Sequence, residues 1–160
     1  MLTIRKGKKK DLPFILELIK ELAKYENAIE QVSITLSELE KDGFGLKQHY
    51  HFLVAEKENN IIGMSFYWFR YSTWKGRFLF LEDFIVKKNY RRQGVGTALF
   101  NATIKVCQEQ NINGMCWQVL DWNQPAIKFY KKYNANISKE WLNGKLDKNQ
   151  LVNFHINTSA

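Results

Sequence analysis

One short stretch, Tyr90-Arg91-Arg92-Gln93-Gly94-Val95-Gly96, constrains this chain more than any other. An apolar, strand-like segment leads into it, and an amphipathic segment with helical spacing follows. Such a loop gathers backbone N–H groups at a helix N-terminus, where the helix dipole favours negative charge. The glycines let ligand oxygens approach the main chain, and the arginines add charge-assisted hydrogen bonds. The stretch predicts a pyrophosphate site, although Arg-x-x-Gly-x-Gly alone is weak and an ordinary glycine-containing loop is the alternative.

The segment before this loop predicts one strand, two helices and three further strands. Leu2–Arg5 alternates as a strand does, and Asp11 followed by Pro13 opens a helix. Apolar residues then recur at helical spacing: Leu12, Ile15, Leu16, Ile19, Leu22 and Ala23. A shorter helix is expected over Leu36–Lys41, before a turn at Asp42–Gly45. An antiparallel meander is expected over His51–Glu56, Ile61–Tyr71 and Arg77–Val86.

The segment after the loop predicts a helix over Gly94–Gln108 and a short strand over Met115–Leu120. Asn123-Gln124-Pro125 starts another helix that runs to about Tyr133. Ile137–Trp141 and Leu151–Ile156 are expected to form a closing pair of strands. This order of elements predicts an α/β fold with a mixed sheet.

The composition fits one compact domain over residues 1–160. Apolar residues make up 45% of the chain, and two prolines and no Ser/Gly-rich tract leave no sign of a linker. No segment approaches the roughly 20 apolar residues of a membrane span, and Met1–Lys6 lacks the apolar core of a signal peptide. We therefore expect a cytoplasmic protein with no membrane partner.

Neither the cysteines nor the histidines predict a metal site. Cys107 and Cys116 lie on apolar stretches without metal-ligand or disulfide spacing, so both are expected to be buried free thiols. The histidines are scattered along the chain, at His49, His51 and His155. We expect no bound metal.

The net charge of +8 is compatible with nucleic acid or with any other polyanionic ligand, including a phosphorylated cofactor. Much of the charge lies in short runs that can form solvated faces: Lys8–Lys10, Lys87–Lys88 and Lys131–Lys132. The chain contains no Gly-x-x-x-x-Gly-Lys-Ser/Thr, Gly-x-Ser-x-Gly or Gly-x-Gly-x-x-Gly pattern. A nucleotide-hydrolysing P-loop and a dinucleotide fingerprint are therefore not supported.

Two adjacent carboxylates, Glu82 and Asp83, interrupt the apolar strand that leads to the loop. In a regular strand successive side chains point to opposite faces, so one of the two must face inward. One interpretation is a pairing with Arg77 or Arg91, or a strand that surfaces locally. The other is a carboxylate pair at a site that needs a negative charge or a base, with a bulge that redirects one side chain.

A second constellation is Asn123 with Tyr130. Asn123 is a good helix N-cap, and Tyr130 lies two turns further on, beside Phe129 and Tyr133. A helical tyrosine among aromatic neighbours is usually a core residue. These two positions therefore indicate a functional role only if another part of a site lies beside them.

Taken together, the acidic strand, Arg91–Gly96, Asn123 and Tyr130 resemble the GNAT superfamily of acetyl-coenzyme A-dependent N-acetyltransferases. Five segments are similar to the diamine (spermidine/spermine) acetyltransferase family: Leu18–Glu26, Asp42–Gly45, Leu53–Glu56, Leu81–Phe84 and Asp121–Gln124. Within that family, Tyr71–Arg77 and Leu120–Gln124 look more like the thialysine Nε-acetyltransferase branch. The resemblance implies a GNAT-type α/β fold with a mixed, mostly antiparallel central sheet flanked by helices.

The resemblance also implies roles for individual residues and a homodimer. The expected coenzyme-binding residues are Phe84, Ile85, Val86, Arg91, Arg92, Gln93, Gly94, Val95, Gly96, Thr97, Asn123 and Tyr130. Glu82, Asp83 and Trp74 are expected to bind the amine. Glu82 is the expected base, directly or through water, because a primary amine is mostly protonated at neutral pH. Tyr130 is the expected acid that protonates the departing thiolate.

The predicted function is therefore direct transfer of an acetyl group from acetyl-coenzyme A, as cosubstrate, to the primary amine of a small molecule. A diamine, a polyamine, thialysine and a lysine-like amine remain open as acceptors. One alternative keeps the fold but acetylates a protein lysine or N-terminus. The other is a basic nucleic-acid-binding module, which explains the charge but leaves Glu82, Asp83 and the glycine loop unexplained.

Overall fold

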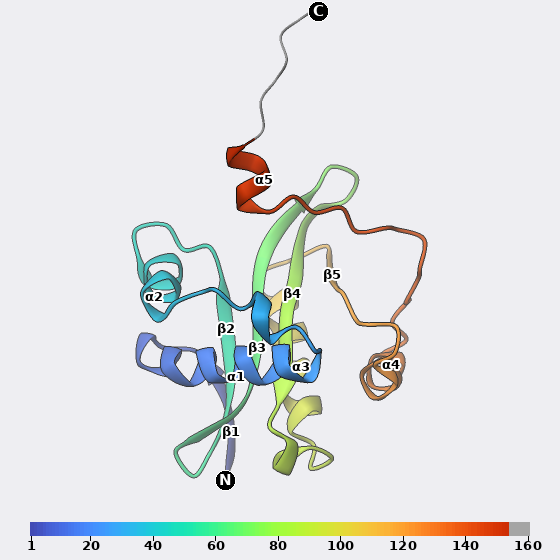
Figure 1. Cartoon of the computed structure of the whole chain (residues 1–160). Coiled ribbons are helices and arrows are strands. Elements are labelled where there is room, and N and C mark those ends of the chain that lie inside the picture. The colour runs from blue at the N-terminus through green and yellow to red at the C-terminus, as the bar shows by residue number, and fades with distance from the viewer. Residues whose placement is uncertain (154–160) are drawn as a thin grey trace, which may run out of the picture. The chain divides into compact units, whose positions relative to one another are not determined.

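The computed structural model describes residues 1–153 and divides the chain into two compact units (Figure 1). The first unit is Met1–Gln118, and the second begins at Val119. The single-domain interpretation of residues 1–160 stays a prediction, because one domain can contain two compact units. Among the described residues, no helix combines the length and the apolar character needed to cross a membrane.

The first unit is built on a five-stranded sheet in the order β1-β2-β3-β4-β5. The strands are β1 (Leu2–Lys6), β2 (His51–Lys57), β3 (Asn60–Ser72), β4 (Gly76–Val86) and β5 (Gly114–Trp117). The first four are antiparallel to their neighbours, and β5 is parallel to β4. The predicted mixed, mostly antiparallel sheet is confirmed.

Three α-helices belong to the same unit: α1 (Leu12–Tyr25), α2 (Leu36–Phe44) and α3 (Val95–Glu109). Three short 3₁₀ turns lie between the elements: η1 (Lys9–Asp11), η2 (Ile29–Gln31) and η3 (Lys88–Tyr90). The predicted helices over Leu12–Ala23 and Gly94–Gln108 are confirmed within one or two residues at each end.

Two predicted boundaries in this unit are wrong. Helix α2 continues through Gly43 and Phe44, where a turn was expected. Gly43 is buried there, and a Cβ at this position would lie 2.4 Å from the Tyr50 ring, so the helix needs a glycine for tertiary packing. Strand β5 ends at Trp117, three residues before the expected Leu120, because Trp117, paired with Leu81 of β4, is its last residue with a partner in the described sheet.

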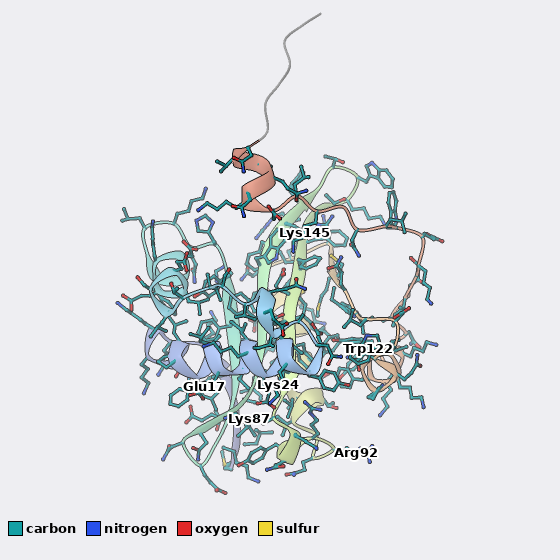
Figure 2. All side chains as sticks on the ribbon, viewed as in Figure 1. Glu17, Lys24, Lys87, Arg92, Trp122 and Lys145 are labelled. Carbon is teal, nitrogen blue, oxygen red and sulfur yellow. The ribbon has the colours of Figure 1, made fainter. Side chains whose placement is uncertain are left out.

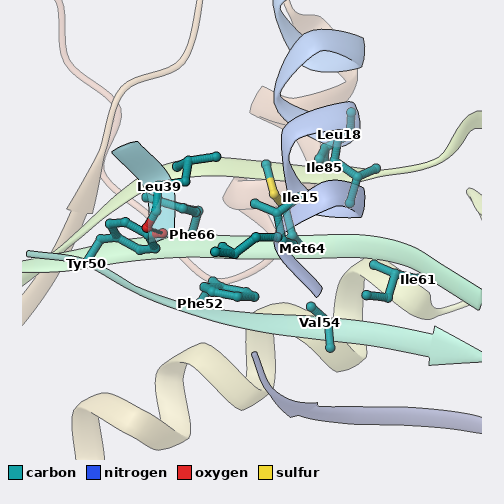
Figure 3. Packing of buried hydrophobic residues seen from close by; sticks show 11 residues of the cluster. Ile15, Leu18, Leu39, Tyr50, Phe52, Val54, Ile61, Met64, Phe66 and Ile85 are labelled. Carbon is teal, nitrogen blue, oxygen red and sulfur yellow. Dashed lines mark hydrogen bonds between the residues drawn. The ribbon is translucent and has the colours of Figure 1, made fainter. Parts of the chain in front are cut away.

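Helices α1 and α2 cover one face of the sheet (Figure 3). Ile15 and Leu18 of α1 are fully buried against side chains of β2, β3 and β4. The sheet residues of this core are Phe52, Val54, Ile61, Met64, Phe66 and Ile85. Tyr50 stacks on Phe66 with ring centroids 4.3 Å apart, and its hydroxyl donates to the carbonyl of Leu39 in α2. We call this side of the sheet the α1 face.

Helix α3 covers the opposite face, which we call the α3 face. Phe100 of α3 packs edge to face on Phe84 of β4, with centroids 5.6 Å apart. The hydroxyls of Ser65 in β3 and Thr103 in α3 are fully buried and share a 2.7 Å hydrogen bond. Strand β4 is therefore covered by helices on both faces.

The second unit contains α4 (Gln124–Lys131) and the short α5 (Lys148–Val152). The predicted helix from Asn123 is confirmed, although it ends before Tyr133. The predicted closing strands are wrong within the described residues: Ile137–Trp141 has no regular secondary structure, and Leu151 and Val152 lie in α5. The rest of the second expected strand, residues 154–156, lies outside the described part of the chain. Asp147 and Gln150 form a capping box that starts α5, which explains the helix.

A charged network fixes the start of α1 against the sheet edge. Asp11, which is 3% exposed, accepts hydrogen bonds from the Arg5 guanidinium at 2.6 and 3.0 Å and from the Lys8 N–H at 2.8 Å. Arg5 also pairs with Glu56 of β2 at 2.6 Å. Burial alone would raise the pKa of Asp11. The hydrogen bonds from Arg5 and Lys8 together have a larger, opposite effect, so the pKa of Asp11 lies below its usual value.

We predict that Asp11→Ala lowers the free energy of unfolding by about 2–4 kcal/mol at neutral pH, because it leaves the half-buried Arg5 with one partner fewer. The stabilisation by Asp11 is lost as pH falls through its lowered pKa. Urea unfolding monitored by circular dichroism measures the change. Lys9→Ala is the control: it breaks an exposed pair with Glu40 and should change stability by less than about 0.5 kcal/mol. Equal losses in the two variants would contradict the prediction.

Candidate active site

A β-bulge in β4 brings the two carboxylates to the same face of the sheet. Phe66 of β3 pairs with Asp83, but the next residue, Tyr67, pairs with Leu81, so Glu82 is an extra residue without a partner in β3. Asp83 lies opposite Phe66, a member of the α1-face core. Glu82 accepts a 2.9 Å hydrogen bond from the Nε1 of Trp68, which packs on that same core. A regular strand would have separated the two acids.

The structure shows the bulge that the second sequence interpretation expected, whereas the role of the two acids at a functional site stays a prediction. Neither Arg77 nor Arg91 forms an ion pair with Glu82 or Asp83 among the described residues: Arg77 lies over the Phe69 ring, and Arg91 donates to a backbone carbonyl. Asp83 is mostly buried, whereas Glu82 is exposed. The pair therefore forms a negative site that opens to solvent through Glu82.

The electrostatics of Asp83 differ from those of an ordinary surface acid. Burial raises the pKa of Asp83 to about 6, and the nearby charges of Glu82 and of Glu26, the C-cap residue of α1, act in the same direction. At neutral pH the carboxylate is thus ionised but destabilised. A cation beside Asp83 would offset the energetic cost of its burial and of its repulsion by the neighbouring acids. The site is therefore suited to binding an ammonium group.

The loop from β4 to α3 has the expected geometry for an anion. Arg92 and Gly94 have positive φ angles of 60° and 79°, so backbone N–H groups on either side can turn toward one concave region. The side chain of Gln93 donates to the Asn89 carbonyl at 2.9 Å, and the Lys57 ammonium lies 5.7 Å from the centroid of the Tyr90 ring. Lys87 and Arg92 both lie on this loop (Figure 2).

Helix α3 begins without a side-chain cap. Its N-cap is Gly94, which has no side chain to accept from the first turn. The first N–H groups of an α-helix have no intrahelical acceptor. A Cβ at Gly94 would meet nothing within 4 Å, so the space beside this residue is open. Val95, Gly96 and Thr97 therefore offer backbone donors at the positive end of the helix dipole.

The edge of β4 opens beyond the bulge. Strand β5 pairs with β4 only over Phe78–Leu81, so in the described sheet the residues from Glu82 to Val86 have a strand partner on one side alone. Phe84, Ile85 and Val86, whose backbone the resemblance expects to bind the pantetheine arm of the coenzyme, lie on this edge. The Val86 carbonyl already accepts from Arg91 Nε at 2.8 Å. An extended ligand could add to this edge as a strand does.

Asn123 and Tyr130 belong to the second unit and are described within it. The Asn123 side chain accepts from the Ala126 N–H at 3.3 Å and caps α4. Tyr130 is 6% exposed, and its ring contacts that of Phe129 edge to face. The structural roles that sequence analysis considered are thus present at both positions. Their expected roles at the coenzyme stay predictions.

Trp74 lies far from Glu82 and Asp83 of the same chain. It occupies the turn between β3 and β4 and is 83% exposed. Gly76 and Glu82 are six positions apart along β4, a span of roughly 20 Å at the rise of a β-strand. The structure therefore does not bring Trp74 to the acid pair, and its expected contact with the amine stays a prediction.

Sequence analysis missed three residues around the site: Trp68, Glu26 and Tyr25. Trp68 orients Glu82, Glu26 adds negative charge near Asp83, and the Tyr25 ring lies 5.5 Å from the Arg91 guanidinium carbon. Tyr25 and Glu26 stand at the end of α1, more than fifty residues before β4. The apolar spacing of the sequence predicts where α1 ends, but it does not predict which residues of the sheet this end of the helix contacts.

The structure tests the prediction for the two cysteines, whereas His155 lies outside the described residues. Cys107 is buried and free, as predicted, but Cys116 is free and only partly buried. Cys116 lies on the short edge strand β5, where one side is incompletely covered, and Arg70 lies 3.8 Å from its sulfur. No group of three or more potential metal ligands occurs among residues 1–153.

A sequence profile of the Acetyltransferase (GNAT) family matches residues 15–135, a range that contains the acid pair, the arginine loop and α4. The chain belongs to this family. It is therefore an N-acetyltransferase, as sequence analysis predicted.

Two relatives and one solved structure agree with this assignment to the GNAT family. The chain is 41% identical over 140 residues to the thialysine N-epsilon-acetyltransferase of Bos taurus, with 82% of each chain covered. It is 34% identical to the human spermidine/spermine N(1)-acetyltransferase-like protein 1, over 82% of this chain and 20% of that protein. The fold matches an aminoglycoside acetyltransferase from a soil metagenome, crystallised with sisomicin, with a TM-score of 0.75 and coverage of 91% and 95%. At 21% identity this last likeness shows the fold alone.

We predict that Asp83→Asn stabilises this GNAT protein at neutral pH but not in acid. The folded-state pKa of about 6 exceeds the ordinary value of 3.8, so the folded protein binds the proton more tightly and stability falls as pH rises from about 4 to 6. The amide removes that loss and should raise the free energy of unfolding by about 1–3 kcal/mol at pH 7.5. Urea unfolding at pH 4 and pH 7.5 tests this. Glu17→Gln, an exposed acid on α1, is the control; a gain independent of pH would refute the account of Asp83.

Proposed function

We propose that the chain transfers an acetyl group directly from acetyl-coenzyme A to the primary amine of a small molecule, with thialysine or a lysine-like amine as the preferred acceptor class. The observation that carries this proposal is the pair Glu82 and Asp83, placed side by side by the bulge at the open edge of β4. The name of the Bos taurus relative supports the acceptor class. The human relative keeps diamines and polyamines as the second candidate class.

The described residues fit the coenzyme as donor. Its pyrophosphate needs several N–H donors and positive charge, which Arg91, Arg92 and the uncapped first turn of α3 offer. Its pantetheine arm carries amide groups that suit the edge of β4 beyond its pairing with β5. The bound donor supplies an acetyl group activated as a thioester. Asn123 is proposed to help place the donor from the start of α4.

The acceptor side must bind a cation and then remove its proton. A primary amine with a pKa near 10 reaches the site mostly as an ammonium ion, which cannot attack a thioester. We propose that Asp83 attracts this cation, because an adjacent positive charge stabilises its buried carboxylate. Glu82, exposed and held by Trp68, then accepts the proton directly or through water.

Tyr130 is proposed to donate a proton to the departing thiolate. Its hydroxyl is attached to a buried ring on α4, a rigid element on which a donor can be held in one orientation. This assignment requires no covalent enzyme intermediate and no metal. A homodimer is likewise proposed from the family resemblance, whereas the cytoplasmic location and the absence of nucleic-acid partners are proposed from the sequence patterns.

We predict different kinetic losses for the proposed base and the proposed acid. Glu82→Gln should lower kcat by about 10²–10⁴-fold, most strongly at low pH where deprotonation of the amine is hardest. Tyr130→Phe removes only a hydroxyl and should lower kcat while the Kd for coenzyme A stays close to that of the wild type. Initial rates from pH 6 to 9 and calorimetric titration measure both effects. Full turnover of Tyr130→Phe across this range would make that tyrosine purely structural, and a pH-independent loss in Glu82→Gln would remove it as the base.

The choice of acceptor is the direct test of the proposed function. Thialysine, lysine and putrescine should be acetylated with kcat/KM at least equal to that for spermine, because the chain's charge of +8 opposes a tetravalent cation. Ser72-Thr73-Trp74 in the β3–β4 turn also lacks an acidic residue that could bind a distant ammonium. The loss of one charged contact can change substrate preference by roughly tenfold or more.

Competition assays at fixed ionic strength should compare these amines with spermidine and with a lysine-containing peptide. A strong preference for spermine would favour the polyamine class and leave the acetyltransferase assignment intact. Transfer to the peptide alone would favour a protein acetyltransferase instead. Failure to acetylate any free amine would overturn the proposed function.

A further inference from the structure

The Arg91 side chain is held by the protein before any ligand arrives. Its Nε donates to the carbonyl of Val86, the last residue of β4, at 2.8 Å. The guanidinium carbon also lies 5.5 Å from the centroid of the Tyr25 ring, within the range of a cation–π contact. A hydrogen bond on one side and an aromatic ring on another restrict where the planar group can point.

The hydrogen bond to Val86 uses only one of the guanidinium donors. The N–H groups on the two terminal nitrogens remain for a ligand, in the fork geometry that suits two phosphate oxygens. A flexible arginine loses conformational freedom when it binds, and this loss weakens affinity. An arginine that is already held loses less, so the fixed geometry of Arg91 favours binding of an anion.

Tyr25 reaches Arg91 from a different part of the fold. It is the last residue of α1, on the α1 face, whereas Arg91 follows β4 in the loop that leads to α3. Tyr25 is 38% exposed, so its ring is not required to fill the core. An exposed aromatic residue at a helix end that contacts the arginine of a charged loop points to a role in that loop.

We propose that Tyr25 is a positioning residue for the donor: it holds the Arg91 guanidinium in the orientation that binds the pyrophosphate of coenzyme A. This inference rests on the proposed function and adds a residue to it that lies outside the glycine loop. The ring provides the contact and the hydroxyl does not. Its effect acts on donor affinity and leaves proton transfer at the acceptor unchanged.

Calorimetric titration of coenzyme A into the full-length chain tests the proposal. Tyr25→Leu should raise the Kd about three- to tenfold, the size expected for a lost cation–π contact and a newly mobile arginine. Tyr25→Phe keeps the ring and should bind within about twofold of the wild type. In steady-state assays the KM for acetyl-coenzyme A should rise by the same factor in Tyr25→Leu, while kcat and the KM for the amine stay unchanged.

Two controls separate positioning from folding. Phe14→Leu removes another exposed aromatic ring from α1, at its opposite end, and should leave the Kd unchanged. In an Arg91→Ala background, Tyr25→Leu should cause no further loss, because its effect passes through that arginine. Tyr25→Met gives a second variant without a ring, and thermal unfolding of each free variant confirms that it is folded.

The outcomes distinguish this inference from the proposed function. If the wild type binds coenzyme A and Tyr25→Leu binds it equally well, the positioning role is overturned and the proposed function stands. An undiminished loss in the Arg91→Ala background, or a Tyr25→Phe variant as weak as Tyr25→Leu, would also overturn it. If the wild type does not bind coenzyme A, the proposed function fails, and the inference that depends on it fails too.

Discussion

The extra residue in β4 is the constraint on which the rest of the candidate site depends. Because Glu82 has no partner in β3, the alternation of side chains breaks at that point, and Glu82 and Asp83 share the α1 face. The pairing of β4 with β5 ends at the neighbouring Leu81, so the edge beyond the bulge is open. One local irregularity thus separates the part of β4 that pairs with β5 from the part beyond it, which carries the two carboxylates on one face.

The packing around β4 explains how the fold tolerates this irregularity. The strand is covered by α1 on one face and by α3 on the other, and its long pairing with β3 continues on both sides of the bulge. Buried apolar contacts of this kind offset the energetic cost of placing Asp83 among them. The result is an acid with a raised pKa on a rigid strand, which is a common feature of functional sites and seldom one of purely structural positions.

Sequence reasoning succeeded where a pattern is local. The apolar spacing in Leu12–Ala23 and the long apolar strands predicted α1 and the meander, and the adjacent acids indicated the bulge. It failed where packing or a cap decides: Gly43 stays helical because of Tyr50, and the capping box of Asp147 and Gln150 makes a helix of residues taken for a strand. That second signal was present in the sequence. The contact between Tyr25 and Arg91 was not, because nothing local relates two residues so far apart.

The missing cap of α3 has a consequence for the dynamics of the protein. Helices α2, α4 and α5 each start with a side chain that accepts from the first turn, from Thr35, Asn123 and Asp147 respectively. Helix α3, which covers the opposite face of the sheet from α1, starts at Gly94 with no such acceptor. The first amide hydrogens of α3 thus have no side-chain acceptor and should exchange with solvent more readily than those of the three capped helices, although α3 itself is packed on the core. An anion seated there would complete the helix, so that occupancy and local order at this end of α3 rise together.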